Sequence, residues 1–169
     1  MVKMHPLIAL FISLFIVQTA LYANEHYLIP EQKSDLIHTL KRKIERAHSL
    51  SIITSQLESA TLDRSIQKLL KNEGNFVLIT TSKTTAAYYA KYKNTSIYLP
   101  KERRPLSTFK IHILLIDHSD VCISSVAFSN EQLQKEHAIV ICTTAQEEVD
   151  FATHLKKLYQ ERFTDYHNP

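Results

Sequence analysis

The chain has 169 residues, of which 44% are hydrophobic and 22% are charged, and its formal net charge is +3 at pH 7. That size and balance predict one globular domain with a hydrophobic core, and they exclude a disordered polypeptide and a repeat array. The charge is too small to indicate a nucleic-acid-binding protein by itself.

Residues 1–23 are predicted to be a secretory signal peptide. Lys3 precedes an apolar run at 7–20, and the small residue Ala23 follows in the stretch "LYAN". That order is typical of export signals, so we expect cleavage after Ala23 and a single mature domain, residues 24–169, in the periplasm or the medium. The alternative is an uncleaved segment that anchors the protein in the inner membrane, although the run is shorter than the roughly 20 apolar residues that span a bilayer.

The first half of the mature chain alternates between helix and strand. Apolar spacing predicts a helix at 34–48, a strand at 50–57, a helix at 59–74, a strand at 75–81, a helix at 82–93 and a strand at 95–100. Ser34 and Ser82 are expected to cap their helices, and Gly74 is expected to end the second helix. The tyrosines of the third helix, Tyr88, Tyr89 and Tyr92, are interpreted as packing residues rather than as a stacking platform for bases.

The second half contains three closely linked apolar runs and a final helix. The runs at 108–117, 120–128 and 137–144 predict strands. Thr144 and Glu147 have the spacing of a capping box, and an apolar stripe extends from Val149 to Phe163. Alternating helices and strands predict parallel pairing, whereas short connections predict antiparallel pairing. The expected fold class is therefore α/β, with a mixed β-sheet flanked by helices.

Polar residues interrupt the three runs at defined positions. If a strand begins near Phe109, Lys110 and His112 share a face and Asp117 lies at the strand's exit. Ser125 and Ala127 are likewise expected to share a face of the next strand, and Glu136 directly precedes the third. A cation beside an imidazole suits an anionic ligand.

The string "KIHILLID", together with this layout, resembles the phospholipase D superfamily over nearly all of the mature chain. The family signature is histidine, any residue, lysine, four residues and aspartate, followed by a glycine-serine pair and an asparagine. Here Lys110 and His112 stand interchanged, and the later string "SSVAF" keeps Ser125 but has neither the glycine nor the asparagine. Asp117, Ser125 and Glu136 match the pattern. The resemblance is to the short, exported, single-motif bacterial endonucleases, with a degenerate HKD motif.

The resemblance implies a phosphodiesterase that needs no metal ion and no cofactor. In the family a histidine attacks phosphorus, a lysine and an asparagine hold the phosphoryl oxygens, and a glutamate orients the histidine. Carried over, the catalytic set is His112, Lys110, Asp117 and Glu136, and the phosphate-binding set is Lys110, His112 and Ser125. A single-motif chain would form a symmetric homodimer to assemble both copies of the motif. The implied ligand is a phosphodiester, either nucleic acid or a phospholipid head group, and contact with a membrane is expected only if residues 1–23 stay attached.

The sequence is compatible with three functions. The favoured one is a domain that binds phosphodiesters with impaired or lost hydrolysis, because a shift of two residues along a strand moves the histidine by roughly 6–7 Å. The second is an active metal-independent phosphodiesterase that uses His112 as base or nucleophile. The third is a structural or partner-binding module in which Lys110 and His112 are ordinary polar residues.

Cys122 and Cys142 both lie in predicted strands. In an oxidising compartment they can form a disulfide if those strands are neighbours with matching side-chain directions. Otherwise they are two buried thiols that act as small hydrophobic residues. No pair of histidines at ligand spacing accompanies them, so the sequence does not indicate zinc.

Overall fold

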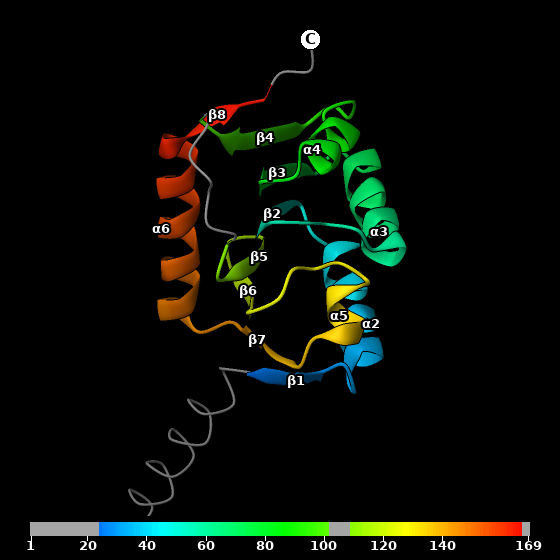
Figure 1. Cartoon of the computed structure of the whole chain (residues 1–169). Coiled ribbons are helices and arrows are strands. Elements are labelled where there is room, and N and C mark those ends of the chain that lie inside the picture. The colour runs from blue at the N-terminus through cyan, green and yellow to red at the C-terminus, as the bar shows by residue number, and fades with distance from the viewer. Residues whose placement is uncertain (1–23, 102–108, 167–169) are drawn as a thin grey trace, which may run out of the picture.

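A computed structural model describes residues 24–101 and 109–166. These residues form one sheet with helices on both of its faces (Figure 1). The strands are β1 (Glu25–Ile29), β2 (Ser49–Thr54), β3 (Asn75–Thr80), β4 (Thr95–Pro100), β5 (His112–Ile116), β6 (Asp120–Ser124), β7 (Ala138–Thr143) and β8 (Phe163–Asp165). The helices are α2 (Lys33–Ile44), α3 (Ala60–Lys71), α4 (Lys83–Tyr89), α5 (Gln132–Lys135) and α6 (Gln146–Arg162). The predicted signal segment, 1–23, lies outside the described residues.

The sheet has the strand order β1-β7-β6-β5-β2-β3-β4-β8. β2, β3 and β4 run parallel to one another, and every other neighbouring pair is antiparallel. The parallel pairs are joined through helices and the antiparallel β5–β6 pair by a tight turn, as expected from the lengths of the connections. The predicted mixed α/β fold is confirmed. Within the described ranges, no helix is long and apolar enough to cross a membrane.

Each face of the sheet buries its own apolar cluster. One cluster lies between the sheet and α2, α3, α4 and α5, and it includes Leu40, Ile66 and Tyr89. The other lies under α6 and includes Phe109 and Val149. Figure 1 shows α6 alone on one face and the other described helices together on the opposite face.

Three elements were not predicted. β1 alternates buried and exposed residues over five positions and pairs with β7. α5 is a single turn between β6 and β7. The third is β8, which Phe163 begins opposite Pro100. Phe163 was predicted to end the apolar stripe of the last helix, and this is wrong because α6 stops at Arg162.

Of the predicted N-terminal helix caps, the one at Ser82 is confirmed and the other two are wrong. Ser82 caps α4, with its Oγ 3.2 Å from the backbone nitrogen of Thr85, as predicted. Ser34 is not a cap, because the turn after β1 starts α2 at Lys33 and places Gln32, two residues before Ser34, at the N-cap. The capping box at Thr144 is also wrong, since Ala145 occupies the N-cap of α6.

Gly74 does not end α3 through its backbone angles. The helix ends at Lys71, and the residue that takes the left-handed conformation is Glu73, with φ of 62°. A Cβ on Gly74 would lie 2.4 Å from Cδ1 of Leu69 and 3.0 Å from the carbonyl oxygen of Leu69. A side chain at this position would therefore require the buried side chain of Leu69 to shift.

Candidate functional site

One edge of the sheet gathers most of the polar residues singled out in the sequence. β5 is antiparallel to β2, so the amino end of β5 meets the carboxyl end of β2. On the other side of β5, His112 pairs with Ser124 at the end of β6, and Ser124 pairs with Val140 near the start of β7. We call this the site edge, and it comprises residues 54–60, 80–85, 109–112, 124–129 and 136–138.

His112 lies buried at the site edge, with 3% of its surface exposed. Its Nδ1 lies 3.1 Å from Oγ1 of Thr54, whose hydroxyl donates its proton to the carbonyl oxygen of Gln56 at 2.8 Å. Because that hydroxyl has one proton, it accepts from His112, which places a hydrogen on Nδ1. Burial lowers the pKa of His112 to about 4. The imidazole is therefore neutral at pH 7 and holds β5 to the end of β2.

Lys110 and His112 do not share a face of a strand. β5 begins only at His112, and Lys110 precedes it with an exposed side chain. The reason lies in Phe109, which turns into the cluster under α6 and stacks its ring 6.1 Å from that of Phe163. The chain straightens into the sheet only after this buried ring. The prediction of a paired cation and imidazole is wrong, although both residues lie at the site edge.

Ser125 and Ala127 also do not share a face of a strand. β6 ends at Ser124, so Ser125 is exposed while Ala127 is fully buried. Gln132 Oε1 accepts a hydrogen bond from the backbone nitrogen of Ala127 at 2.6 Å. The shared face predicted for Ser125 and Ala127 is wrong, and only the serine reaches the surface.

Ser124 stands where the signature that the sequence resembles has glycine, and the sequence assigned it no role of its own. Its Oγ donates to the carbonyl oxygen of Val126 at 2.8 Å and accepts from the backbone nitrogen of the same residue at 3.1 Å. The side chain is buried. It closes the turn that exposes Ser125, and it offers nothing to a ligand.

Glu136 lies at the site edge with an exposed side chain, directly after α5. Its backbone nitrogen bonds to the carbonyl oxygen of Gln132. In the part of the chain that the structure describes, the ion pairs are Lys43–Asp120, Lys68–Glu45 and Lys135–Glu131, so Glu136 and Lys110 do not form one.

Asp117 lies at the opposite end of β5. Its Oδ1 accepts hydrogen bonds from the backbone nitrogens of His48 at 2.8 Å and Ser49 at 2.7 Å. The residue has φ of 49°, in the left-handed region that aspartate tolerates. About 16 Å of strand separates it from His112. Asp117 therefore lies away from the site edge. Its hydrogen bonds hold the start of β2 in place.

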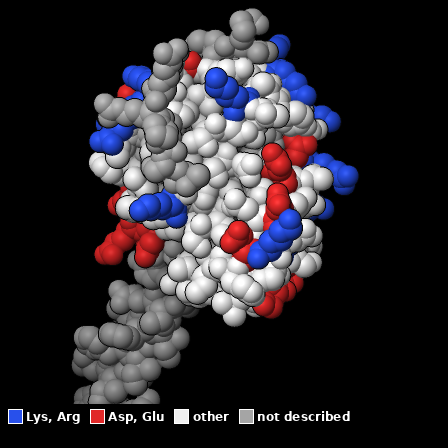
Figure 2. Space-filling model, in the orientation of Figure 1, with Lys and Arg blue, Asp and Glu red and all other residues white. Residues whose placement is uncertain are grey.

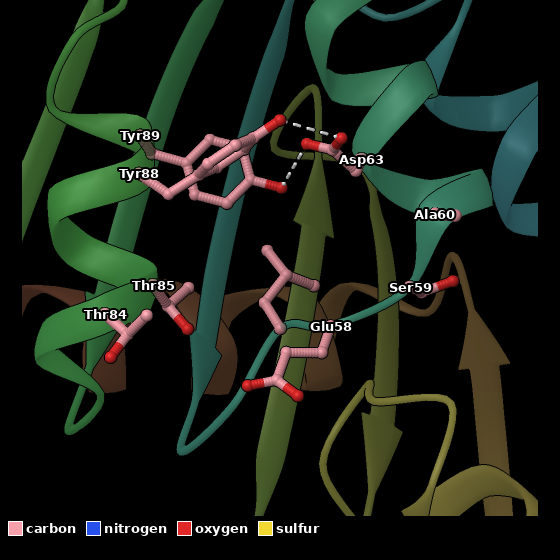
Figure 3. A pocket seen from close by; sticks show the side chains of 9 residues that line it. Glu58, Ser59, Ala60, Asp63, Thr84, Thr85, Tyr88 and Tyr89 are labelled. Carbon is pink, nitrogen blue, oxygen red and sulfur yellow. Dashed lines mark hydrogen bonds between the residues drawn. The ribbon is translucent and has the colours of Figure 1, made fainter.

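Among the residues that the structure describes, the surface around the site edge has no continuous basic patch. Figure 2 shows the face across which the β2–α3 and β6–α5 connections run, and its middle is mostly uncharged, with charged side chains scattered around it. A pocket of about 390 Å³ opens at the same edge between α3 and α4 (Figure 3). Among the described residues, no group of three or more His, Cys, Asp or Glu side chains could hold a metal ion.

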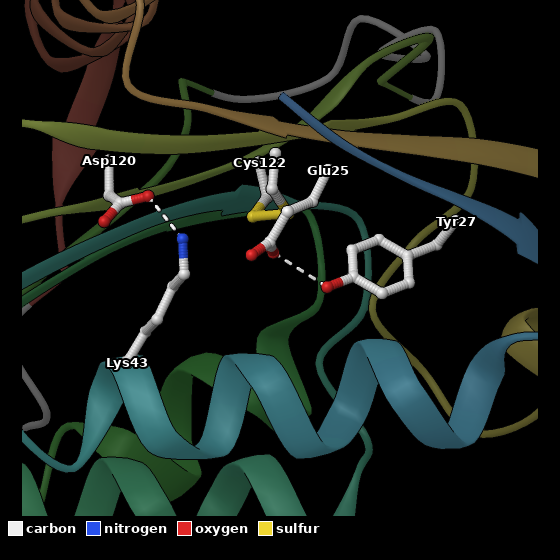
Figure 4. The surroundings of a disulfide bond; sticks show 6 residues. Glu25, Tyr27, Lys43, Asp120 and Cys122 are labelled. Carbon is white, nitrogen blue, oxygen red and sulfur yellow. Dashed lines mark hydrogen bonds and ion pairs between the residues drawn. A yellow bond between two sulfur atoms is a disulfide. The ribbon is translucent and has the colours of Figure 1, made fainter. Parts of the chain in front are cut away.

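Cys122 and Cys142 form a disulfide between directly opposed residues of β6 and β7. Both cysteines are buried on the α2 side of the sheet (Figure 4). Close by, Lys43 of α2 forms an ion pair with Asp120 at the start of β6, with the two charged atoms 2.6 Å apart. Of the two states that the sequence left open, the structure has the bridged one.

Comparison with known proteins finds similar solved structures but no matching sequence family. No protein-family model matches the chain, and no curated protein matches it. NucT from Helicobacter pylori is 18% identical with a TM-score of 0.75, and the match covers 86% of this chain and 99% of NucT. The phospholipase D family member Nuc from Salmonella typhimurium is 11% identical with a TM-score of 0.71, covering 87% and 99%. Phosphatidylserine synthase from Haemophilus influenzae is 11% identical with a TM-score of 0.64, covering 86% of this chain and 39% of the synthase.

Proposed function

Since the chain has the phospholipase D-like fold, we propose that it binds phosphodiester groups at the site edge without hydrolysing them. The observation that carries this proposal is the burial of His112. A nucleophile must come within about 3 Å of phosphorus in line with the leaving group. A ring that is 3% exposed and already bonded to Thr54 is not placed to do so. The neutral imidazole also lacks the positive charge that the family's lysine brings to this position.

Lys110 supplies the attraction for the ligand. It stands at the position of the family's histidine and is exposed, so its ammonium group can approach a phosphate directly. Three N–H donors and no acceptor make that group a phosphate binder rather than a nucleophile. Ser125, also exposed, offers a hydroxyl at the same edge.

The ligand chemistry is a phosphodiester, from nucleic acid or from a phospholipid head group. NucT and Nuc have this fold over their whole length, and the synthase has it over part of its length. The charges of the described residues are scattered in Figure 2, which favours a contact with one or two phosphates over a long polyanion track in that part of the surface.

We also propose that the protein is exported, with residues 1–23 removed as a signal peptide. The buried disulfide supports this because disulfides persist in oxidising compartments and are rare in the cytosol. N-terminal sequencing of the protein recovered from cells should begin at Asn24. A chain that still begins at Met1 would contradict the proposal and would leave a membrane-anchored form.

A homodimer is the proposed assembly, and an apolar patch on the α6 face of the sheet supports it. Leu28 and Ile139 are cross-strand partners, Ile141 lies two residues along β7, and their exposed fractions are 55%, 53% and 39%. α6 packs on β3 to β6 and leaves this end of the face open. We call Leu28, Ile139 and Ile141 the β1–β7 patch.

One pair of measurements tests the function. The mature protein is incubated with single-stranded DNA and with a chromogenic phosphodiester, with and without chelator, and we expect no turnover. Binding to single-stranded DNA and to vesicles of anionic phospholipid is titrated at low salt, and we expect Lys110→Ala to weaken it. Lys93→Ala, which removes an exposed lysine from the opposite edge, serves as the matched control.

The other two functions correspond to other results. Chelator-resistant turnover that disappears in His112→Ala would show an active phosphodiesterase and overturn the proposal. Undetectable binding to both probes, or binding that Lys110→Ala leaves unchanged, would instead favour the structural module.

A further inference from the structure

The pocket between α3 and α4 uses none of the residues assigned to phosphodiester binding. Its volume is about 390 Å³, and it lies where β2 and β3 end. In open α/β sheets the carboxyl ends of parallel strands are the usual place for a ligand. The lining residues are Leu57, Glu58, Ser59, Ala60, Asp63, Thr84, Thr85, Tyr88 and Tyr89.

Asp63 is the fixed polar group of this pocket. Its Oδ2 accepts hydrogen bonds from the hydroxyl of Tyr88 at 3.0 Å and from Nε2 of Gln67 at 2.9 Å, and its Oδ1 accepts from the hydroxyl of Tyr89 at 3.0 Å. Figure 3 shows both tyrosines pointing at Asp63. A carboxylate has about four acceptor positions, so one on Oδ1 remains for a ligand.

The tyrosine hydroxyls stay protonated and keep Asp63 in place. The pKa of Tyr88 is raised to about 12 by its hydrogen bond with Tyr92, by burial and by Asp63. The pKa of Tyr89 is raised further, chiefly by burial and then by Asp63. Both groups therefore donate to the carboxylate at any physiological pH.

The charge of the pocket is negative. Its lining contains two acids, Asp63 and Glu58, and no lysine or arginine, and neither acid takes part in the ion pairs of the described residues. Glu58 lies across the pocket from Asp63, with an exposed side chain (Figure 3). The outer wall already attracts a cation, since Nζ of Lys91 lies 4.0 Å from the centroid of the Tyr88 ring. A phosphate or carboxylate ligand would be repelled here.

From this arrangement we propose that the pocket binds a small organic ammonium ion, with its ammonium group at Asp63 and its apolar body between the tyrosine rings and Leu57, while Glu58 across the pocket adds negative charge. This site goes beyond phosphodiester binding and stands whether or not Lys110 and Ser125 hold a phosphate. The ammonium group donates a hydrogen bond to the remaining acceptor position on Oδ1 of Asp63. The apolar body of the ligand covers apolar pocket wall that is otherwise exposed to water.

Three probes of matched shape test the class of ligand. Benzylammonium, benzyl alcohol and benzoate are each titrated into the mature protein, and backbone amide shifts are followed by NMR. We expect benzylammonium to shift the amides of Ala60 and Thr85 and to bind about tenfold more tightly than the alcohol, because a hydrogen bond to a charged group is involved. Benzoate should leave these amides unshifted. Equal affinity for amine and alcohol, or shifts confined to other residues, would overturn the proposal.

Two variants separate charge from shape. Asp63→Asn keeps an acceptor for the tyrosines and should weaken benzylammonium binding by about tenfold. Glu58→Gln changes an exposed side chain and should weaken it by about twofold to fivefold without altering the fold. The matched control is Glu73→Gln, at the far end of α3, which should bind as the native protein does. If Asp63→Asn loosens the contact between α3 and α4, the test rests on Glu58→Gln alone. Native affinity of the Glu58→Gln variant for benzylammonium would then overturn the proposal.

Discussion

Nδ1 of His112 and Oγ1 of Thr54 lie 3.1 Å apart and join the amino end of β5 to the carboxyl end of β2. The two residues are 58 positions apart in the sequence, and both are buried. Two residues earlier, Lys110 is exposed. Lys110 and His112 of "KIHILLID" are therefore in different environments. His112 joins two strands at the sheet edge, whereas Lys110 is exposed to solvent.

His112→Ala should destabilise the protein while leaving ligand binding by Lys110 in place. The substitution removes a buried ring and a hydrogen-bond partner of Thr54, so we expect the free energy of unfolding to fall by about 2–4 kcal/mol. Urea denaturation of the mature protein measures this. Lys110→Ala, at an exposed position, should change stability by less than about 0.5 kcal/mol. Equal stability of His112→Ala and the native protein would show that the bond to Thr54 contributes nothing.

The same histidine should make stability depend on pH below neutrality. Its pKa is about 4 in the folded protein, against an ordinary value of 6.5, because burial disfavours the charged ring. Between these values the unfolded chain binds the proton and the folded chain does not, so stability rises with pH. The contribution is complete above pH 6.5 and is lost as the pH falls toward 4, by at most about 3 kcal/mol.

Urea unfolding at a series of pH values checks this dependence. His112→Gln, which cannot titrate, is the matched variant. The difference in unfolding free energy between native protein and variant should shrink as the pH falls from 6.5 to 4. A difference that stays constant over this range would show that His112 titrates alike in both states.

Asp117→Ala should lower stability without affecting ligand binding. The change removes the acceptor for the backbone nitrogens of His48 and Ser49, and we expect a loss of about 2 kcal/mol in the free energy of unfolding. Titration with single-stranded DNA and with vesicles should give native affinities once the protein is folded. Weaker binding by a fully folded Asp117→Ala protein would contradict the placement of this residue away from the site.

The fold class could be read from the sequence because it depends on local pattern. Alternating helical and strand-like runs, and short links between 108 and 144, are enough to predict a mixed sheet. The ends of strands are not fixed by local pattern. Alternation from Phe109 onward predicts a strand that includes Lys110, but the packing of Phe109 against Phe163, more than fifty residues away, delays the strand to His112.

The candidate site was harder to predict for the same reason. The hydrogen-bond partner of His112 is Thr54, far away in the sequence, and the role of Asp117 depends on the start of β2. The state of Cys122 and Cys142 depends on the register between β6 and β7, which neither strand encodes alone. The pocket at Asp63 corresponds to no sequence motif, and its signal in the sequence is the adjacent pair of tyrosines at 88 and 89, whose hydroxyls need a polar partner when buried.

Reduction of the disulfide should weaken the fold. The bridge closes a loop of 20 residues, so the chain-entropy model gives about 3 kcal/mol of stabilisation. Urea unfolding with and without a thiol reductant measures the effect, and Cys122→Ala with Cys142→Ala is the matched variant. The double variant should unfold at a lower urea concentration than the native protein and should not respond to the reductant. Identical midpoints for the oxidised and reduced native protein would contradict the expected contribution.

The β1–β7 patch should govern the oligomeric state. A two-fold axis over this face would bury Leu28, Ile139 and Ile141 of both copies, and a charge placed there would have to be desolvated at the interface. We therefore expect the native mature protein to sediment as a dimer and Ile139→Glu to sediment as a monomer with an unchanged circular dichroism spectrum. Ala87→Glu places the same charge on exposed α4, on the opposite face of the sheet, and should leave the dimer intact. A native protein that sediments as a monomer at all concentrations would contradict the assembly, and a dimer that persists in Ile139→Glu would assign the interface to another surface.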